Sequence, residues 1–253
     1  MATLTTTVRH DVSADVVFIK ATGGLDLRTA NVMRALLLRC RAECPTAIVV
    51  DITECSADAP AALTVFPSVA RHQDAHPLVT ILLCGVTSDF LRNGGSAALG
   101  AIRTFRTCAE ALSAAEYVRD GQQRVELHAQ RSPIAPGLAR VAVGVACDRW
   151  DLDPLRVPAL LIISELVTNA VLHADGEIDI EAVLRGDYLH MRVHDESPEP
   201  PTPVTPLEGP APREYGRGLQ IVANYSTAWG YVVNQGSTGK VVWATLRVPP
   251  VRS

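Results

Sequence analysis

The sequence predicts two α/β (α+β) domains, each with a mixed β-sheet covered by helices. In the first half of the chain, short apolar runs typical of buried strands alternate with segments of helical periodicity. In the second half, long helical segments are followed by pairs of β-rich runs. A chain of 253 residues exceeds the usual size of a single hydrophobic core, so we expect two domains of ordinary size.

The composition is that of a folded protein with no affinity for nucleic acid. Hydrophobic residues make up 47% of the chain and charged residues 20%. The net charge of −4 and the lack of a Lys/Arg run exclude a basic surface for DNA or RNA. The N-terminus does not read as a signal peptide, and no stretch approaches 18 unbroken apolar residues. We therefore expect a cytoplasmic protein that does not enter a membrane.

The six cysteines form no C-x-x-C pair, and most lie in apolar segments, as reduced core thiols do. Cys40 with Cys44, and His72 with His76, have the i,i+4 spacing at which two helical side chains could share a metal ion. Each pair lacks a second pair of ligands at zinc-site spacing, so a metal role is not favoured.

Strands and helices alternate through the first half of the chain. The glycines at 23–24 mark a turn after the first strand, and Pro45 ends the first helix. The predicted strands are 16–21, 47–52, 78–84 and 101–103, and the predicted helices are 29–43, 61–72, 88–94 and 107–118. This order indicates a mainly parallel or mixed sheet with helices on it.

Three features of residues 1–118 resemble the STAS fold of anti-sigma factor antagonists. They are the motif G-G-L-D-L-R-T-A at 23–30, the motif I-V-V-D-I-T at 48–53, and a helix that starts some ten residues after the aspartate of the second motif. The resemblance implies an N-terminal STAS domain with a helix-covered mixed sheet.

One segment departs from that family. Its members begin this helix with D-S-[ST]-G-L, whose hydroxyl accepts phosphate from a partner kinase, whereas residues 58–63 read D-A-P-A-A-L. The positions that would carry the hydroxyl, depending on the alignment, are Ala59, Pro60 and Ala61. Ser56 precedes the turn, and Thr64 is already a turn into the helix. Phosphoryl transfer needs an oxygen nucleophile, so this domain is expected to bind partners without being phosphorylated in the usual way.

A polar, aperiodic segment at 119–124 is the predicted linker to a second domain at 125–253. The predicted strands of this domain are 125–129, 178–184, 188–193, 228–234 and 240–248, with helices at 138–150 and 158–174. Pro158 suits the first turn of the second helix. Residues 196–215 contain seven prolines and are expected to form a lid. The glycine pair at 216–218 then runs into a helix, as in anion-binding loops.

Three polar residues stand out on the apolar helix 158–174. Glu165, Asn169 and His173 are spaced i, i+4, i+8 and share one helical face. A polar side chain that is buried unsatisfied costs about 1 to 3 kcal/mol. This face is therefore expected to look onto water, a ligand or an ion, or to be satisfied internally.

The order of motifs in the second half resembles the ATP-binding domain of the GHKL superfamily, in its anti-sigma factor serine kinase branch. The motifs are E-L-V-T-N-A-V-L-H-A at 165–174, V-H-D-E-S-P at 193–198, the Pro-rich loop, G-R-G-L-Q-I-V at 216–222 and G-K-V-V-W at 239–243. The resemblance implies a two-layer α/β sandwich of the GHKL (Bergerat) type that binds ATP and Mg²⁺.

The resemblance implies a role for three of these side chains. Asn169 would ligate the Mg²⁺ that bridges the phosphates, and Glu165 would position or activate the attacking group. Asp195 would accept the adenine amino group, in keeping with a carboxylate that only accepts hydrogen bonds.

The remaining candidates have weaker support. Gly216 and Gly218 would frame the lid and admit the phosphates, with Arg217 as a countercharge. Lys240 could reach a phosphate or could be a solvated strand lysine. His173 is expected to pack or to support the site.

These expectations combine into a partner-switching regulator of transcription. The second domain would be an ATP-dependent protein serine/threonine kinase, and its partners would be a sigma factor or a STAS-domain antagonist. The first domain would be a regulatory dock. An intramolecular contact between the two domains is compatible with the sequence, and so is a homodimer. The chain has no phosphoaccepting His on a dimerisation helix, as sensor kinases need, and no room for the transducer domains of other branches. The alternative is a non-catalytic adaptor that sequesters a sigma factor or a STAS partner.

Overall fold

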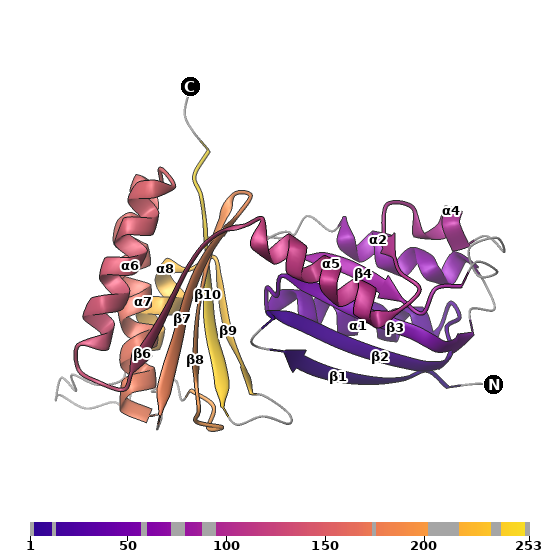
Figure 1. The fold of residues 1–253 in the computed structure, drawn as a ribbon, viewed down its shortest axis with the longest axis horizontal. Coiled ribbons are helices and arrows are strands. Elements are labelled where there is room, and N and C mark those ends of the chain that lie inside the picture. Colours follow the sequence, from indigo (N-terminus) through magenta and orange to yellow (C-terminus); the bar gives the residue numbers. More distant parts are fainter. Residues whose placement is uncertain are drawn as a thin grey trace. The chain divides into compact units, whose positions relative to one another are not determined.

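The computed structural model describes the chain in eight segments and divides it into two units. The described residues are 3–11, 14–56, 60–71, 79–87, 95–173, 176–201, 218–233 and 239–250. The units are Met1–Gly121 and Gln122–Ser253, and each contains its own five-stranded sheet (Figure 1).

The first unit is a mixed sheet with strand order β1-β2-β3-β4-β5, in which only β1 is antiparallel to its neighbour. The strands are β1 (Thr5–Asp11), β2 (Val16–Gly24), β3 (Ala47–Ser56), β4 (Thr80–Cys84) and β5 (Arg103–Thr104). The helices are α1 (Thr29–Ala42), η1 (Pro60–Thr64), α2 (Val65–Ala70), α4 (Ser96–Leu99) and α5 (Cys108–Asp120). This architecture confirms the predicted helix-covered mixed sheet.

Helices cover both faces of this sheet. Ile48 and Val50 of β3 belong to the cluster that contains Met33 of α1 and Phe66 of α2. Val49 belongs to a second cluster, formed with small residues of α5. A strand buried on both faces reads as a continuous apolar run, which explains why β3 could be predicted from the sequence.

Two elements of the first unit differ from the sequence prediction. The edge strand β1 was not predicted, because its Thr-rich sequence has too few apolar residues to show alternation. The helix predicted at 61–72 begins instead as the 3₁₀ helix η1 and becomes α-helical only at Val65. The helix predicted at 88–94 lies outside the described residues.

The expectation that the cysteines are reduced thiols was wrong for Cys84 and Cys108, which form a disulfide. Cys84 ends β4, and Cys108 begins α5 after the capping box of Thr107 and Glu110. The strand-to-helix connection brings their Cα atoms to 5.0 Å, within the range a disulfide can bridge. Spacing in the sequence carries no signal of this proximity. The other four cysteines form no disulfide with any described residue.

The second unit is a two-layer sandwich with an entirely antiparallel sheet of order β6-β7-β8-β10-β9. The strands are β6 (Gln123–Gln130), β7 (Glu177–Arg185), β8 (Tyr188–Asp195), β9 (Ala228–Val233) and β10 (Lys240–Arg247). The helices α6 (Ala135–Arg149), α7 (Asp153–His173) and α8 (Gly218–Tyr225) lie on one face of the sheet (Figure 1). The predicted two-layer α/β sandwich is confirmed.

The boundary between the units contains little chain outside regular structure. Helix α5 continues to Asp120 and β6 begins at Gln123, so Gly121 and Gln122 alone separate them, where the sequence predicted a linker over 119–124.

The central helix α7 starts earlier than predicted. It begins at Asp153, so Pro158 lies in the helix interior and Pro154 occupies the tolerated first turn. Pro158 cannot donate the backbone hydrogen bond to residue 154. The helix is long and apolar enough to cross a membrane by length and composition. Its buried apolar residues, however, form the core of the second unit together with the sheet.

The disulfide predicts a measurable response of the first unit to reductant. Closing a 24-residue separation stabilises a fold by about 3 kcal/mol through the entropy of the unfolded chain. Reduction should therefore lower the free energy of unfolding by about this amount, measured in urea with and without dithiothreitol.

Thiol titration of the denatured chain provides the control. Four thiols should react before reduction and all six after it. The variant Cys55→Ser, which removes a free thiol, should keep the full response to reductant. Six reactive thiols in the unreduced protein would contradict the assignment.

Candidate functional site

Helix α7 presents two half-buried polar side chains, Glu165 and Asn169, one turn apart. The buried residues of the helix include Ile162, Leu166 and Ala170, and they pack against the sheet. Neither polar side chain forms a hydrogen bond within the described part of the chain. A carboxylate and a carboxamide are thus held next to the core, and their polar atoms form no hydrogen bond with the described residues.

Burial has a clear electrostatic effect on Glu165. Desolvation raises the pKa of its carboxyl above the usual value, because partial removal from water penalises the charged form. A carboxylate with a raised pKa is a better proton acceptor near neutral pH than an ordinary one.

Glu165 also lies against the first residue of α8. A Cβ atom built on Gly218 would come within 2.5 Å of Oε2 of Glu165. Glycine at this position therefore allows α8 to approach α7 closely, and it brings the N-terminal turn of α8 to the carboxylate. The sequence singled out Gly218 for admitting a phosphate, which stays a prediction, and gave no sign of its contact with Glu165.

Asp195 occupies the last position of β8 and is 1% exposed. Its Oδ1 accepts hydrogen bonds from the backbone N–H of Ser197 at 2.9 Å and from Nζ of Lys240 at 2.8 Å. Lys240 is the directly opposite residue of β10 and is also 1% exposed.

The environment of Lys240 matches neither alternative drawn from the sequence. It is not a solvated strand lysine, because it is buried, and its ammonium is engaged with Asp195 and not held free for a phosphate. Hydrophobic patterning could not reveal this pairing, because it depends on the register of β8 against β10.

Two glycines to which the sequence assigned no role of their own shape the end of β8. Gly239 has φ +114°, and a Cβ there would collide with the backbone carbonyl of Asp195. Gly176 has φ +91°, and a Cβ there would collide with the carboxylate of Glu196. A positive φ is the signal that favours glycine, but it cannot be seen in one sequence without its backbone.

Several predicted site residues are not among those that the structure places near Glu165, Asn169 or Asp195. Gly216, Arg217 and residues 202–215 of the predicted Pro-rich lid lie outside the described residues. His173 is exposed at the end of α7, and its expected packing or supporting role stays a prediction.

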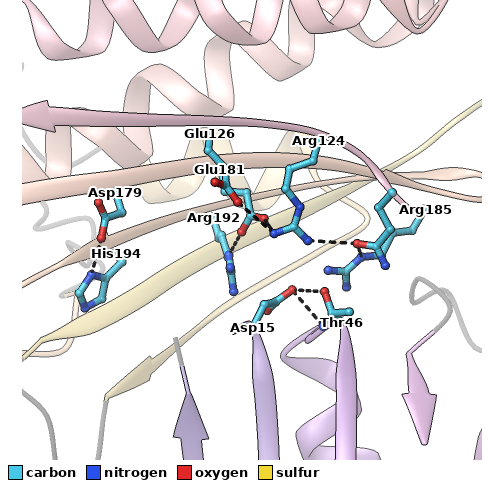
Figure 2. Close-up of polar contacts among 10 residues, drawn as sticks. Asp15, Thr46, Arg124, Glu126, Asp179, Glu181, Arg185, Arg192 and His194 are labelled. Carbon is cyan, nitrogen blue, oxygen red and sulfur yellow. Dashed lines mark hydrogen bonds and ion pairs between the residues drawn. The ribbon is translucent and has the colours of Figure 1, made fainter. Parts of the chain in front are cut away.

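The sheet face away from the helices carries a separate charged network (Figure 2). Glu181 on β7 forms ion pairs with Arg124 on β6 and Arg192 on β8. Asp179, also on β7, lies 3.4 Å from the ring nitrogen Nδ1 of His194. Opposite charges on neighbouring strands stabilise their pairing, so this network adds to the stability of the pairing among β6, β7 and β8.

The close contact at Gly218 predicts a loss of stability in Gly218→Ala. The added methyl group must displace the Glu165 carboxylate, which is the far end of a flexible side chain, so the cost is that of a strained rotamer, about 0.5 to 1.5 kcal/mol. Urea unfolding of the full chain measures the change.

Gly137→Ala is the matched control, because Gly137 is also helical and the nearest atom to its added Cβ, on Arg140, is 3.7 Å away. That variant should gain about 0.5 kcal/mol from the reduced entropy of the unfolded chain. Equal effects of the two substitutions would contradict the contact.

A protein-family model matches most of the second unit. Residues 129–246 match the family model of the histidine kinase-like ATPase domain. No curated protein matches the chain significantly.

Two solved structures that resemble part of the chain are anti-sigma factor antagonists. One, from Mycobacterium paratuberculosis, is 18% identical with a TM-score of 0.36, covering 45% of this chain and 94% of that chain. The other, SpoIIAA in its unphosphorylated form, is 17% identical with a TM-score of 0.37, covering 45% of this chain and 97% of that chain. Residues 129–246, which make up most of the second unit, are thus similar to the histidine kinase-like ATPase domain family.

Proposed function

We propose that the chain is an ATP- and Mg²⁺-binding regulator of the anti-sigma factor serine kinase type. The observation that carries the proposal is the match of residues 129–246 to the histidine kinase-like ATPase domain. It is supported by the two uncommitted side chains on α7 and by the buried carboxylate at the end of β8.

The donor set of α7 fits a magnesium ion. Mg²⁺ prefers oxygen ligands and is commonly held by one or two protein groups together with substrate phosphates. The carboxamide oxygen of Asn169 is such a group, and it is uncommitted within the described residues. When bound, Mg²⁺ would neutralise charge on the phosphates.

The protein side chains supply the remaining functions. Asp195 accepts the exocyclic amino group of adenine through Oδ2, and Glu165 accepts the proton of an attacking hydroxyl. The raised pKa of Glu165 favours this second role. The segment between β8 and α8 is the candidate lid.

We further propose that the first domain is a regulatory dock. Its η1 helix begins with Pro60 and Ala61, which offer no hydroxyl, so a partner that binds there is not released by phosphorylation of that segment. Fusion of the two domains raises their effective mutual concentration to roughly millimolar. The partners are a sigma factor or a STAS-domain antagonist, and the setting is the cytoplasm.

Nucleotide binding should depend on Asn169. Calorimetric titration of the full chain with ATP should show binding that magnesium strengthens, and Asn169→Ala should remove the magnesium dependence with at least a tenfold loss of affinity (~1.4 kcal/mol). Leu172→Ala, which changes an exposed residue on the same helix, should bind as the native chain does. Equal magnesium-dependent binding by all three proteins would remove Asn169 from the site.

Phosphate should not appear on the first domain. After incubation of the chain with ATP and magnesium, mass spectrometry should find residues 1–118 unmodified, because the acceptor position lacks a hydroxyl. A separate STAS domain that retains the serine should be phosphorylated in the same mixture. Phosphate on the first domain would contradict the dock, and absence of transfer to the separate substrate would favour the adaptor over the kinase.

A further inference from the structure

The buried pair of Asp195 and Lys240 is placed where the proposed site needs an uncommitted carboxylate. Both residues are 1% exposed, and Nζ of Lys240 lies 2.8 Å from Oδ1 of Asp195. They stand opposite each other at the ends of β8 and β10, with Ile178 of β7 on the other side of Asp195. The pair is therefore fixed by the register of three strands.

Stability alone is a weak reason for such a pair. Removing two charges from water costs several kcal/mol per ion, and an apolar pair of similar volume often stabilises a protein equally well. What the pair achieves is orientation, because the carboxylate is held in one rotamer from two directions.

The hydrogen bonds divide the two carboxylate oxygens. Oδ1 receives both the ammonium of Lys240 and the backbone N–H of Ser197. Oδ2 receives no hydrogen bond from the described residues. Asp195 thus presents one oxygen to a ligand and not two.

A carboxylate that offers one oxygen to the base recognises a different purine from a carboxylate that offers both. Adenine directs a single amino donor toward a carboxylate, and the neighbouring ring nitrogen N1 is an acceptor. Guanine directs two parallel donors, N1–H and the 2-amino group, which pair with both oxygens of a free carboxylate in the bidentate manner of a guanidinium. A carboxylate with Oδ1 already filled fits adenine and leaves one guanine donor without a partner.

We propose that Lys240 determines base specificity by positioning Asp195: it occupies Oδ1, so that the site accepts a purine with one amino donor and rejects guanine. This inference rests on the proposed nucleotide-binding function. Leaving a buried donor unpaired is the physical basis of the rejection, since sites that hydrogen-bond their ligand discriminate most strongly when a group is left unsatisfied.

The test compares ATP and GTP binding to the native chain and to Lys240→Met and Lys240→Gln, in the presence of magnesium. The native chain should prefer ATP. Lys240→Met has no donor, so Oδ1 becomes available and the ratio of ATP to GTP affinity should fall about tenfold. Lys240→Gln keeps a donor without the charge and should retain the native preference.

The two variants separate positioning from a purely structural role, because both lose the charge and only one loses the donor. An unchanged preference in folded Lys240→Met would overturn the inference, as would equal loss of preference in both variants. Should the methionine variant fail to fold, Lys240→Leu carries the same expectation, since leucine also has no donor and differs little from methionine in volume.

Failure of the inference is distinguishable from failure of the proposed function. If the native chain binds neither nucleotide, the proposed function fails together with the inference. If it binds ATP and the preference does not respond to Lys240, only the specificity role is overturned.

Discussion

The packing of α7 against the second sheet is the interaction on which the candidate site depends. Seven residues of this helix are buried, and they join the sheet in a single core. These seven residues form an apolar stripe along α7 that fixes the rotation of the helix about its axis. Glu165 and Asn169 are therefore held at the edge of the stripe, where they are half-buried. A helix free to rotate would expose these groups to solvent and satisfy them there. The packing of the core therefore determines where Glu165 and Asn169 lie. Partial burial also raises the pKa of the Glu165 carboxyl.

The sheet contributes a second fixed point through strand register. Antiparallel pairing of β8 with β10 sets Asp195 directly opposite Lys240, and Gly239 lets the backbone pass close to Asp195. A shift of β10 by one residue would turn Lys240 to the other face of the sheet and separate it from Asp195. Helix and sheet thus each fix one part of the candidate site, and the chain from β8 to α8 connects them.

Much of the fold could be predicted from the sequence because its buried strands and amphipathic helices carry strong periodicity. The run at β3 and the helical spacing of α1 and α7 are examples. The Thr-rich edge strand β1 escaped prediction, since an edge strand needs little apolar sequence. The true start of α7 was also missed, because two prolines both suit a first turn and only the backbone distinguishes them.

The candidate site was predicted less completely than the fold. Helical spacing singled out Glu165 and Asn169, the glycine pair before a helix singled out Gly218, and the resemblance to the GHKL ATP-binding domain singled out Asp195. The Lys240 pair and the disulfide of Cys84 and Cys108 depend on contacts between segments far apart in the sequence, 45 and 24 residues respectively. Periodicity reports the environment of a residue and not the identity of its neighbour, so such pairs emerge only from the three-dimensional arrangement.

The most direct measurement is a crystal structure of the full chain with a non-hydrolysable ATP analogue and magnesium. The account predicts the adenine amino group on Oδ2 of Asp195, Lys240 still on Oδ1, and the metal ion on the Asn169 carboxamide. A nucleotide bound elsewhere, or a base that displaces Lys240 from Asp195, would contradict it.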